Sequence, residues 1–204
     1  MADYMIADTH WNHRRVLEFQ PCRIPGLELR TDSIEEMNWS IDFRWNKVVK
    51  PSDVIIHLGD GAFGHYDVRH LNGYKVFIKG NHDKGIRTLL NDGWDEAYNW
   101  QDYFKRYGPY VIYLPDGKEI SCVLTHIPVT TDWMDEHNVD FNLHGHLHSF
   151  PPPTPRHLCL SIEQTGFEPM SADQIMVQLG RKLYALPDGR FSVPGDGGSV
   201  IEVG

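Results

Sequence analysis

The chain has 204 residues, which is enough for one domain with a substantial core and small for two. Its formal net charge of -9, with histidine counted as neutral, argues against broad binding to a nucleic-acid backbone, because that binding requires a basic face. The three cysteines are widely spaced and form no C-x-x-C pair, so the sequence disfavours a disulfide framework and a thiolate zinc site and favours a reducing compartment.

A strand and a long helix are the first elements predicted. The apolar run at 4–7 indicates a strand that ends at polar residues, whereas residues 20–32 hold two prolines and a glycine and indicate a loop. Ser33 and Glu36 then match a capping box, and apolar side chains recur behind them at spacings of three and four. Pro51 marks the end of this helix.

Two buried strands and a short helix are predicted next. The apolar runs at 54–58 and 74–78 have the character of buried strands, and residues 86–91 show a short helical pattern with Gly93 just past its end. The segment that follows, 94–107, is rich in aromatic residues. It suits either a base-stacking platform or the packing of a core, and packing is favoured because aromatic side chains dominate protein cores.

The second half of the chain has the pattern of a hairpin followed by more strands. Runs at 110–114 and 119–125 flank the turn sequence Pro-Asp-Gly-Lys, and further strands are predicted at 139–143 and 158–162. Strands that alternate with helices and then with hairpin-like strands predict an α/β fold. The expected architecture is a four-layer α/β/β/α sandwich of two mixed sheets flanked by helices.

One metal-binding domain is expected to cover residues 1–204. A capping pattern at Ser171 begins a last helix, and the core is expected to cover 1–184. Residues 185–204 form a Gly/Pro-rich C-terminal extension, with one weak hairpin predicted at 187–190.

Polar residues follow five of the predicted strands, at the point where each strand ends. They are Asp8 and His10, Asp60, Asn81 and His82, His126, and His146 and His148. Ligand sites in open α/β sheets form at the carboxyl ends of strands. Carboxylate, imidazole and amide groups without thiolate suit divalent ions such as Mn, Fe, Co, Ni or Zn, and two ions that share a carboxylate would use the whole set. One residue separates Asp8 from His10 and His146 from His148, and this spacing implies turn backbone at the strand ends. Gly59, Gly80 and Gly145 are expected to supply the conformational freedom for these turns.

Taken in order, these motifs resemble those of the calcineurin-like metallophosphoesterases. They are Asp-Thr-His at 8–10, Gly-Asp at 59–60, Gly-Asn-His-Asp at 80–83, His126, and Gly-His-x-His at 145–148. Each motif alone is common, but five in this order are specific, and they span most of the chain. The Asp-Thr-His-x-x-His start, the Trp-Asn-Lys-Val at the end of the long helix and the Leu-Asn-Gly before the third strand look like small phosphoesterases of phages and bacteria.

The resemblance implies a role for each residue. One ion would bind Asp8, His10 and His148, the other would bind Asn81, His126 and His146, and Asp60 would bridge them. A hydroxide that bridges the ions would attack phosphorus. His82 would not be a ligand but would protonate the leaving oxygen, and Asp83 would orient the His82 ring.

The other histidines have less specific assignments. His57 lies within a strand and is interpreted as a core residue or as support for a ligand, and His144 is interpreted as a supporting residue. For His13, an approach to the site and a role at a helix start are equally compatible with the sequence. A further set is expected in surface or loop positions, namely His65, His70, His137 and His157.

The sequence therefore predicts a dimetal phosphoesterase that acts on phosphodiesters, and also on monoesters, of small substrates such as nucleotides. The alternatives are a nuclease on DNA or RNA, a protein phosphatase and a catalytically silent metal-binding scaffold. Neither extended nucleic-acid binding nor a membrane partner is expected, since no apolar run approaches the length of a membrane span. Because a cleaved leader would remove Asp8 and His10, a cytoplasmic location is expected.

Overall fold

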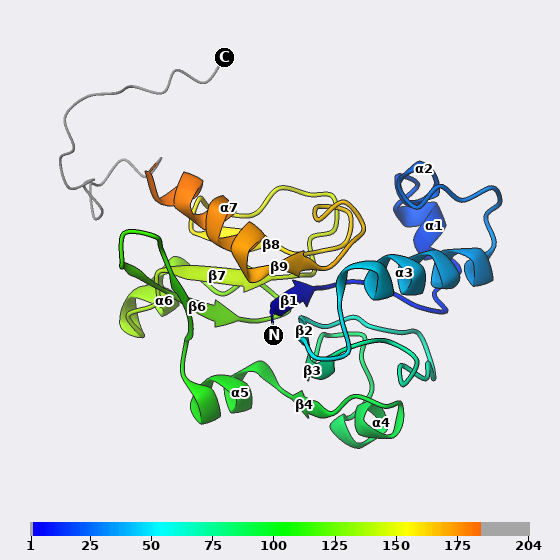
Figure 1. The fold of residues 1–204 in the computed structure, drawn as a ribbon, viewed down its shortest axis with the longest axis horizontal. Coiled ribbons are helices and arrows are strands. Elements are labelled where there is room, and N and C mark those ends of the chain that lie inside the picture. Colours follow the sequence, from blue (N-terminus) through cyan, green and yellow to red (C-terminus); the bar gives the residue numbers. More distant parts are fainter. Residues whose placement is uncertain (1, 185–204) are drawn as a thin grey trace, which may run out of the picture.

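The computed structural model describes residues 2–184, which form two β-sheets flanked by helices (Figure 1). The first sheet has the strand order β4-β3-β2-β1-β9. Its strands are β1 (Asp3–Ile6), β2 (Val54–His57), β3 (Tyr74–Ile78), β4 (Glu96–Tyr98) and β9 (Met170–Ser171). Strands β1 to β4 run parallel to one another, and β9 runs antiparallel to β1, so this sheet is mixed.

The second sheet is also mixed and has the order β5-β6-β7-β8. Its strands are β5 (Tyr110–Tyr113), β6 (Glu119–Leu124), β7 (Phe141–His144) and β8 (His157–Cys159). Strands β5 and β6 form the predicted antiparallel hairpin, whereas β6, β7 and β8 run parallel. The predicted α/β fold with two mixed sheets flanked by helices is therefore confirmed.

Two long helices begin at the caps that the sequence predicts. The helices are α1 (Val16–Phe19), α2 (Arg23–Gly26), α3 (Ile34–Val48), α4 (Ile86–Asn91), α5 (Trp100–Tyr107), α6 (Thr131–Glu136) and α7 (Ala172–Tyr184). At α7, Ser171 and Gln174 cap each other reciprocally. At α3, the Ser33 hydroxyl accepts the Glu36 N–H, but the Glu36 carboxylate accepts backbone N–H groups of the preceding loop, so only half of the predicted capping box forms.

Four helices, α1, α2, α5 and α6, were not predicted. Residues 20–32, predicted as a loop, contain the single turn of α2. Helix α6 is capped by Thr130, whose hydroxyl accepts the N–H of Trp133, and that cap is a signal present in the sequence. The aromatic stretch 94–107 includes β4 and α5, and all of its rings except the exposed Tyr107 pack in or against the cores, which agrees with the packing interpretation.

Side chains that alternate along the strands contribute to different cores. On β3, Phe77 packs with residues of α3, while its neighbour Ile78 belongs to the core between the two sheets. On β6, Leu124 belongs to that same core, whereas Val123 faces the other way and packs with Met134 of α6. Both sheets are thus apolar on both faces, which leaves the ends of their strands as the places for polar side chains.

Three further expectations concern the C-terminal extension, membrane-spanning helices and the cysteines. The C-terminal extension and the weak hairpin predicted at 187–190 lie outside the described residues. Within residues 2–184, none of the helices is both apolar enough and long enough to cross a bilayer. Cys22, Cys122 and Cys159 are all free thiols, as their spacing predicts, and the last two are buried in the second sheet.

Candidate metal centre

The predicted ligands lie in loops that directly follow strands of both sheets. Asp8 follows β1, Asp60 follows β2, His126 follows β6, and His146 and His148 follow β7. Because β1, β2 and β3 are parallel to one another, as are β6 and β7, the loops after them emerge at the same edge of each sheet. The fold therefore gathers residues that are far apart in the sequence.

The first ligand group consists of Asp8, His10 and His148, whose ligand atoms all lie within 4.8 Å of one another. The Nε2 atoms of His10 and His148 lie 3.8 and 3.9 Å from Asp8 Oδ1. The other Asp8 oxygen, Oδ2, accepts the hydroxyl of Ser161 and the backbone N–H of His146. One oxygen of this carboxylate is thus held by the protein, and the other faces the two imidazoles.

The second ligand group consists of Asp60, His126 and His146, again within 4.8 Å of one another. Asp60 Oδ2 lies 3.2 Å from His126 Nε2 and 3.8 Å from His10 Nε2, so the same oxygen is near both groups. His126 Nδ1 donates to the backbone carbonyl of Leu58 at 2.8 Å, which directs Nε2 towards Asp60. The position of Asp60 between the groups matches the bridging role that the resemblance implies.

Buried polar atoms without partners indicate that these groups fit metal ions. Asp8 Oδ1, His10 Nε2 and His126 Nε2 are buried and have no hydrogen-bond partner among the described residues. Leaving such atoms unpaired is costly unless a cation binds them. Carboxylate oxygen with imidazole nitrogen is also a donor set that divalent transition metals prefer.

The shifted pKa values of the ligands also indicate that these groups fit metal ions. Burial raises the pKa of the Asp8 carboxyl despite the nearby His126 and His148. Burial and the charge of Arg23 lower the pKa of His10 to about 2, so His10 is the neutral imidazole that metals bind. For His126, burial alone would lower the pKa, but the carboxylates of Asp60 and Asp8 raise it to about 9. The two carboxylates thus favour a positive charge at this position, as a bound cation would supply.

The backbone at the ligands is held in an unusual conformation. Positive φ angles occur at Asp8 (59°), His10 (53°), Asp60 (54°), His146 (71°) and His148 (51°). Non-glycine residues adopt this left-handed region at a cost, and such residues cluster at functional sites. The turn backbone predicted from the ligand spacing is therefore present, and the ligands themselves adopt it.

The glycines next to the ligands act differently from one another. Gly59 has a φ of 91° and supplies conformational freedom as predicted. Gly80 and Gly145 are not among the residues with positive φ. A Cβ at Gly80 would lie 2.3 Å from Asp60 Oδ1, and one at Gly145 would lie 2.6 Å from Asp8 Oδ2. The prediction of conformational freedom at these two positions is wrong, because what they provide is space for the carboxylates.

His82 and Asn81 lie at the rim of the second group. The His82 side chain is 61% exposed, with Nε2 4.0 Å from Asp60 Oδ2, and the His82 backbone N–H donates to Asp60 Oδ1 at 3.0 Å. Asn81 is exposed and stands between Gly80 and His82, both of which approach the Asp60 carboxylate. The structure thus brings both predicted residues to the site.

Asp83 does not orient the His82 ring, and that prediction needs correction. Its carboxylate accepts the backbone N–H groups of Asp60 and Gly80 at 2.7 Å each and of Gly61 at 2.9 Å. Among the hydrogen bonds of the described chain, none joins Asp83 to the imidazole of His82. Asp83 is buried, and a buried carboxylate is most stable when it accepts N–H groups, so it ties together the two loops that carry Asp60 and His82.

A buried ion pair behind the first group was missed by the sequence analysis. Arg23 of α2 is fully buried, and its guanidinium lies 2.6 Å from Glu163 and donates to the backbone carbonyls of Asp8 and Thr9. The same Glu163 oxygen lies 3.0 Å from Nδ1 of His148. A carboxylate that accepts from the far nitrogen of a ligand histidine fixes the orientation of that ring.

The remaining histidines divide between the core and the rim. His57 stacks on Phe77 in the core, and its Nε2 lies 2.9 Å from the hydroxyl of Thr9, which confirms a core and supporting position. The His13 ring lies 5.2 Å from the His10 ring, so this residue approaches the site. The backbone carbonyl of His13 accepts the N–H of Val16 where α1 begins, so His13 also lies at a helix start, and both interpretations hold.

Two histidines of the second sheet lie deep in the protein. His144 is buried, and its Nδ1 lies 2.7 Å from the carbonyl of Gly145, beside the ligand loop. The surface position predicted for His157 is wrong, since only 1% of this residue is exposed. Its two nitrogens bond to Thr154 and to the carbonyl of Val129, which compensates for its burial in β8.

Comparisons with known proteins agree with the fold. No family model matches the sequence. The chain is 27% identical over 201 residues to an uncharacterised protein of Methanocaldococcus jannaschii, covering 91% of this chain and 96% of the relative. A solved structure of a protein of unknown function from Aquifex aeolicus superposes with a TM-score of 0.61 and 24% identity, covering 85% of this chain and 97% of that one. This likeness supports the fold alone.

Two solved structures with phosphoesterase names superpose more loosely. One is a predicted phosphoesterase of Streptococcus pneumoniae, with a TM-score of 0.33, 16% identity, and coverage of 78% of this chain and 70% of that one. The other is an archaeal phosphodiesterase, with a TM-score of 0.40, 16% identity, and coverage of 79% and 82%. Superpositions this loose do not show what the present chain does.

Proposed function

We propose that this protein is a metal-dependent phosphoesterase of the calcineurin-like type that hydrolyses phosphodiesters, and also monoesters, of small substrates. The observation that carries the proposal is the Asp60 carboxylate, one oxygen of which approaches ligand histidines of both groups. Two ions held a few ångströms apart are the arrangement that clamps both sides of an in-line displacement at phosphorus.

The residues divide the work of holding the ions. Asp8, His10 and His148 would hold one ion, Asn81, His126 and His146 the other, and Asp60 would contact both. Bound ions of this kind supply Lewis acidity and a nucleophile at neutral pH. The protein contributes buried, oriented donors, which need little rearrangement when the ions bind.

His82 would donate the proton to the leaving oxygen. Its ring is largely exposed at the rim, while its backbone N–H is fixed to the Asp60 carboxylate, so the imidazole stands beside the place where a phosphate would lie. An imidazole has the proton affinity for this role near neutral pH, and a positioned acid of this kind contributes about 10²–10⁴-fold. The acidic net charge favours small esters over long nucleic acids as substrates.

A chromogenic assay tests the proposal. The purified chain should hydrolyse bis(p-nitrophenyl) phosphate in the presence of Mn²⁺, Ni²⁺, Co²⁺ or Zn²⁺ and should lose this activity on chelation. Turnover of single- or double-stranded DNA, or of a phosphopeptide, in preference to small diesters would favour a nuclease or a protein phosphatase. If the protein binds these metals but hydrolyses no ester with any of them, it is a metal-binding scaffold and the proposal is wrong.

The role of His82 has its own test. His82→Ala should keep the full metal content but lose about 10²–10⁴-fold in rate on alkyl esters, and less on nitrophenyl esters, which need no acid. His137→Ala, which changes an exposed histidine stacked on Trp133, is the matched control and should behave as the wild type. Loss of metal from His82→Ala would instead make this residue a ligand.

A further inference from the structure

Exposed aromatic rings stand directly beside the first ligand group. The ring of His13 lies 5.2 Å from that of the ligand His10 and stacks on Phe63 at 5.0 Å with an interplanar angle of 17°. Phe19 of α1 lies 6.4 Å from His13. Phe63 and Phe19 are 61% and 56% exposed, although large apolar side chains are normally buried. We refer to His13, Phe19 and Phe63 as the ring wall.

Hydrogen bonds between two loops hold the backbone under the ring wall. The segments that follow Asp8 and Asp60 pair with each other, since Trp11 and Ala62 form a parallel bridge and the N–H of Phe63 donates to the carbonyl of Trp11 at 2.7 Å. Between them, Asn12 exchanges hydrogen bonds with Asn38 of α3. The two loops that supply ligands therefore also fix the place of Phe63 relative to the metal centre.

We propose that the ring wall binds a flat aromatic group of the substrate by stacking, so that the preferred substrates are phosphoesters of nucleoside-like compounds. This proposal rests on the proposed phosphoesterase function and names its substrate class. The rings of His10, His13 and Phe63 follow one another at 5.2 and 5.0 Å. A substrate whose phosphate binds at the ligand groups could therefore place a ring on Phe63. Stacking tolerates any base, because every base has a π-face, so the ring wall selects a class of substrate.

Neighbouring charge favours a nucleotide over a purely apolar group. The guanidinium of Arg15 lies over Phe19, 4.7 Å from the ring centroid, and its Nε lies 3.5 Å from the Glu18 carboxylate, so a cation and a carboxylate both border the ring wall. An apolar chain would gain nothing from these polar groups, whereas the hydroxyl groups of a ribose can donate hydrogen bonds to the carboxylate and accept them from the guanidinium. His13 covers one face of Phe63, and the exposed fraction of Phe63 leaves area for a second ring.

Paired ligands that differ only in the base test the proposal without requiring turnover. Binding of AMP and of ribose 5-phosphate to the Mn²⁺-loaded protein would be measured by calorimetry. The wild type should bind AMP more tightly than ribose 5-phosphate. Phe63→Ala should weaken AMP binding by roughly 5- to 100-fold and leave ribose 5-phosphate unchanged, because it removes stacking alone. Phe63→Trp should keep the preference for AMP.

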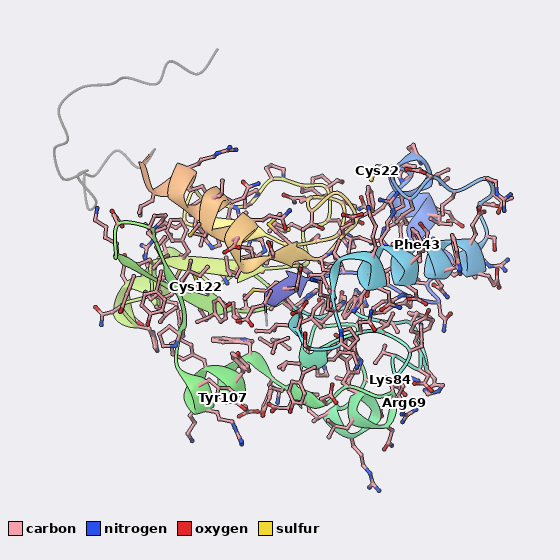
Figure 2. The ribbon with its side chains drawn as sticks, in the orientation of Figure 1. Cys22, Phe43, Arg69, Lys84, Tyr107 and Cys122 are labelled. Atoms are coloured by element: carbon pink, nitrogen blue, oxygen red, sulfur yellow. The ribbon has the colours of Figure 1, made fainter. Side chains whose placement is uncertain are left out.

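The matched control is another exposed phenylalanine. Phe43 of α3, which is labelled in Figure 2, is 57% exposed and stacks on Trp39. Phe43→Ala should leave both affinities unchanged. The metal content of every variant is measured and should equal that of the wild type. A change in affinity then reports on the ring and not on lost metal.

The outcomes separate this proposal from the proposed function. If AMP and ribose 5-phosphate bind equally to the wild type, if neither binds, or if Phe63→Ala weakens both alike, the ring wall does not bind a base and the proposal is overturned. Metal-dependent hydrolysis of bis(p-nitrophenyl) phosphate would stand in each of those cases. Conversely, a base-dependent affinity lost in Phe63→Ala without hydrolysis of any ester would support the ring wall and refute the phosphoesterase function.

Discussion

The two ligand groups are supported in different ways. In the first group, His148 is anchored through Nδ1 to the buried carboxylate of Glu163, which is itself paired with Arg23. In the second group, His126 is anchored through Nδ1 to a backbone carbonyl, and Asp83 holds the loop of Asp60 through backbone N–H groups. A buried ion pair between two side chains supports the first group, whereas hydrogen bonds to backbone groups, which join segments 23 and 68 residues apart, support the second.

This difference predicts different vulnerabilities. A buried ion pair is costly to break on one side, because removing one partner leaves an uncompensated charge in the interior. A carbonyl that accepts from a histidine carries no net charge and cannot be removed by a side-chain substitution. The first group should therefore depend on the ion pair of Arg23 and Glu163, whereas the second should depend on the loops that carry its ligands and on Asp83, which ties them together.

The shared carboxylate should give the largest effect, because it belongs to both groups. Asp60→Asn keeps the shape of the side chain but removes the charge that approaches His10 and His126, so ester hydrolysis should fall to background and the metal content should drop. Metal analysis and the bis(p-nitrophenyl) phosphate assay measure the two losses. Asp67→Asn, at an exposed carboxylate paired with Arg69, is the control; full activity in Asp60→Asn would remove the basis for the bridging role.

Loss of the buried guanidinium should give the next largest effect. Arg23→Met leaves Glu163 buried without its cation and should cost about 3–5 kcal/mol in the free energy of unfolding, measured by urea denaturation of the metal-free protein. Arg69→Met removes an exposed arginine, labelled in Figure 2, and should change stability little. Equal stability of Arg23→Met and wild type would show that the pair contributes nothing.

The pH dependence of that deficit has a definite sign. Burial opposes the charge of Glu163, but the hydrogen bond with His148 and the charge of Arg23 together lower the pKa of Glu163 below its ordinary 4.5. A lowered pKa stabilises the folded state above the ordinary value, and this contribution is lost as the pH falls through the folded-state pKa. The deficit of Arg23→Met should therefore shrink as the pH falls below about 4.5; a constant deficit would assign it to packing alone.

Removing only the charge of Glu163 should have a smaller and more local effect. Glu163→Gln should weaken metal binding at the first group about 10–100-fold, because the ligand His148 loses the carboxylate that orients it, and should leave the second group unchanged. A calorimetric titration that resolves two binding events measures this split. Glu168→Gln, whose carboxylate pairs with Lys47 on the surface, is the control, and equal weakening of both events would contradict the separate support of the groups.

The smallest effect is expected from Asp83→Asn. The amide nitrogen of Asn cannot accept the N–H groups that the carboxylate now accepts, so stability should fall by about 1–3 kcal/mol. Because Asp83 bonds to backbone and not to the His82 ring, the variant should keep the wild-type pH profile of hydrolysis at temperatures where it stays folded. A shifted pH profile in the folded variant would instead restore the direct role of Asp83 on His82.

Much of the fold could be predicted from local patterns. The helix Ile34–Val48 and the strand Tyr74–Ile78 were predicted because apolar periodicity and caps act between residues close in sequence. The gathering of the ligands was predicted because polar residues after parallel strands emerge at the same edge of a sheet, and their division into two groups was implied by the resemblance to the calcineurin-like metallophosphoesterases. The short helices α1 and α2 were not predicted, since one or two turns carry too few residues to show a period.

The sequence by itself thus determined which residues gather and at which end of the strands they do so. Only the tertiary structure decided what surrounds them: Arg23 reaches Glu163 across 140 residues, Asp83 bonds to the backbone, and the pairing of two loops brings Phe63 onto the ring of His13. The reason is physical. Strand and helix patterns arise from neighbours along the chain, whereas these contacts depend on how distant segments pack, which no local spacing encodes.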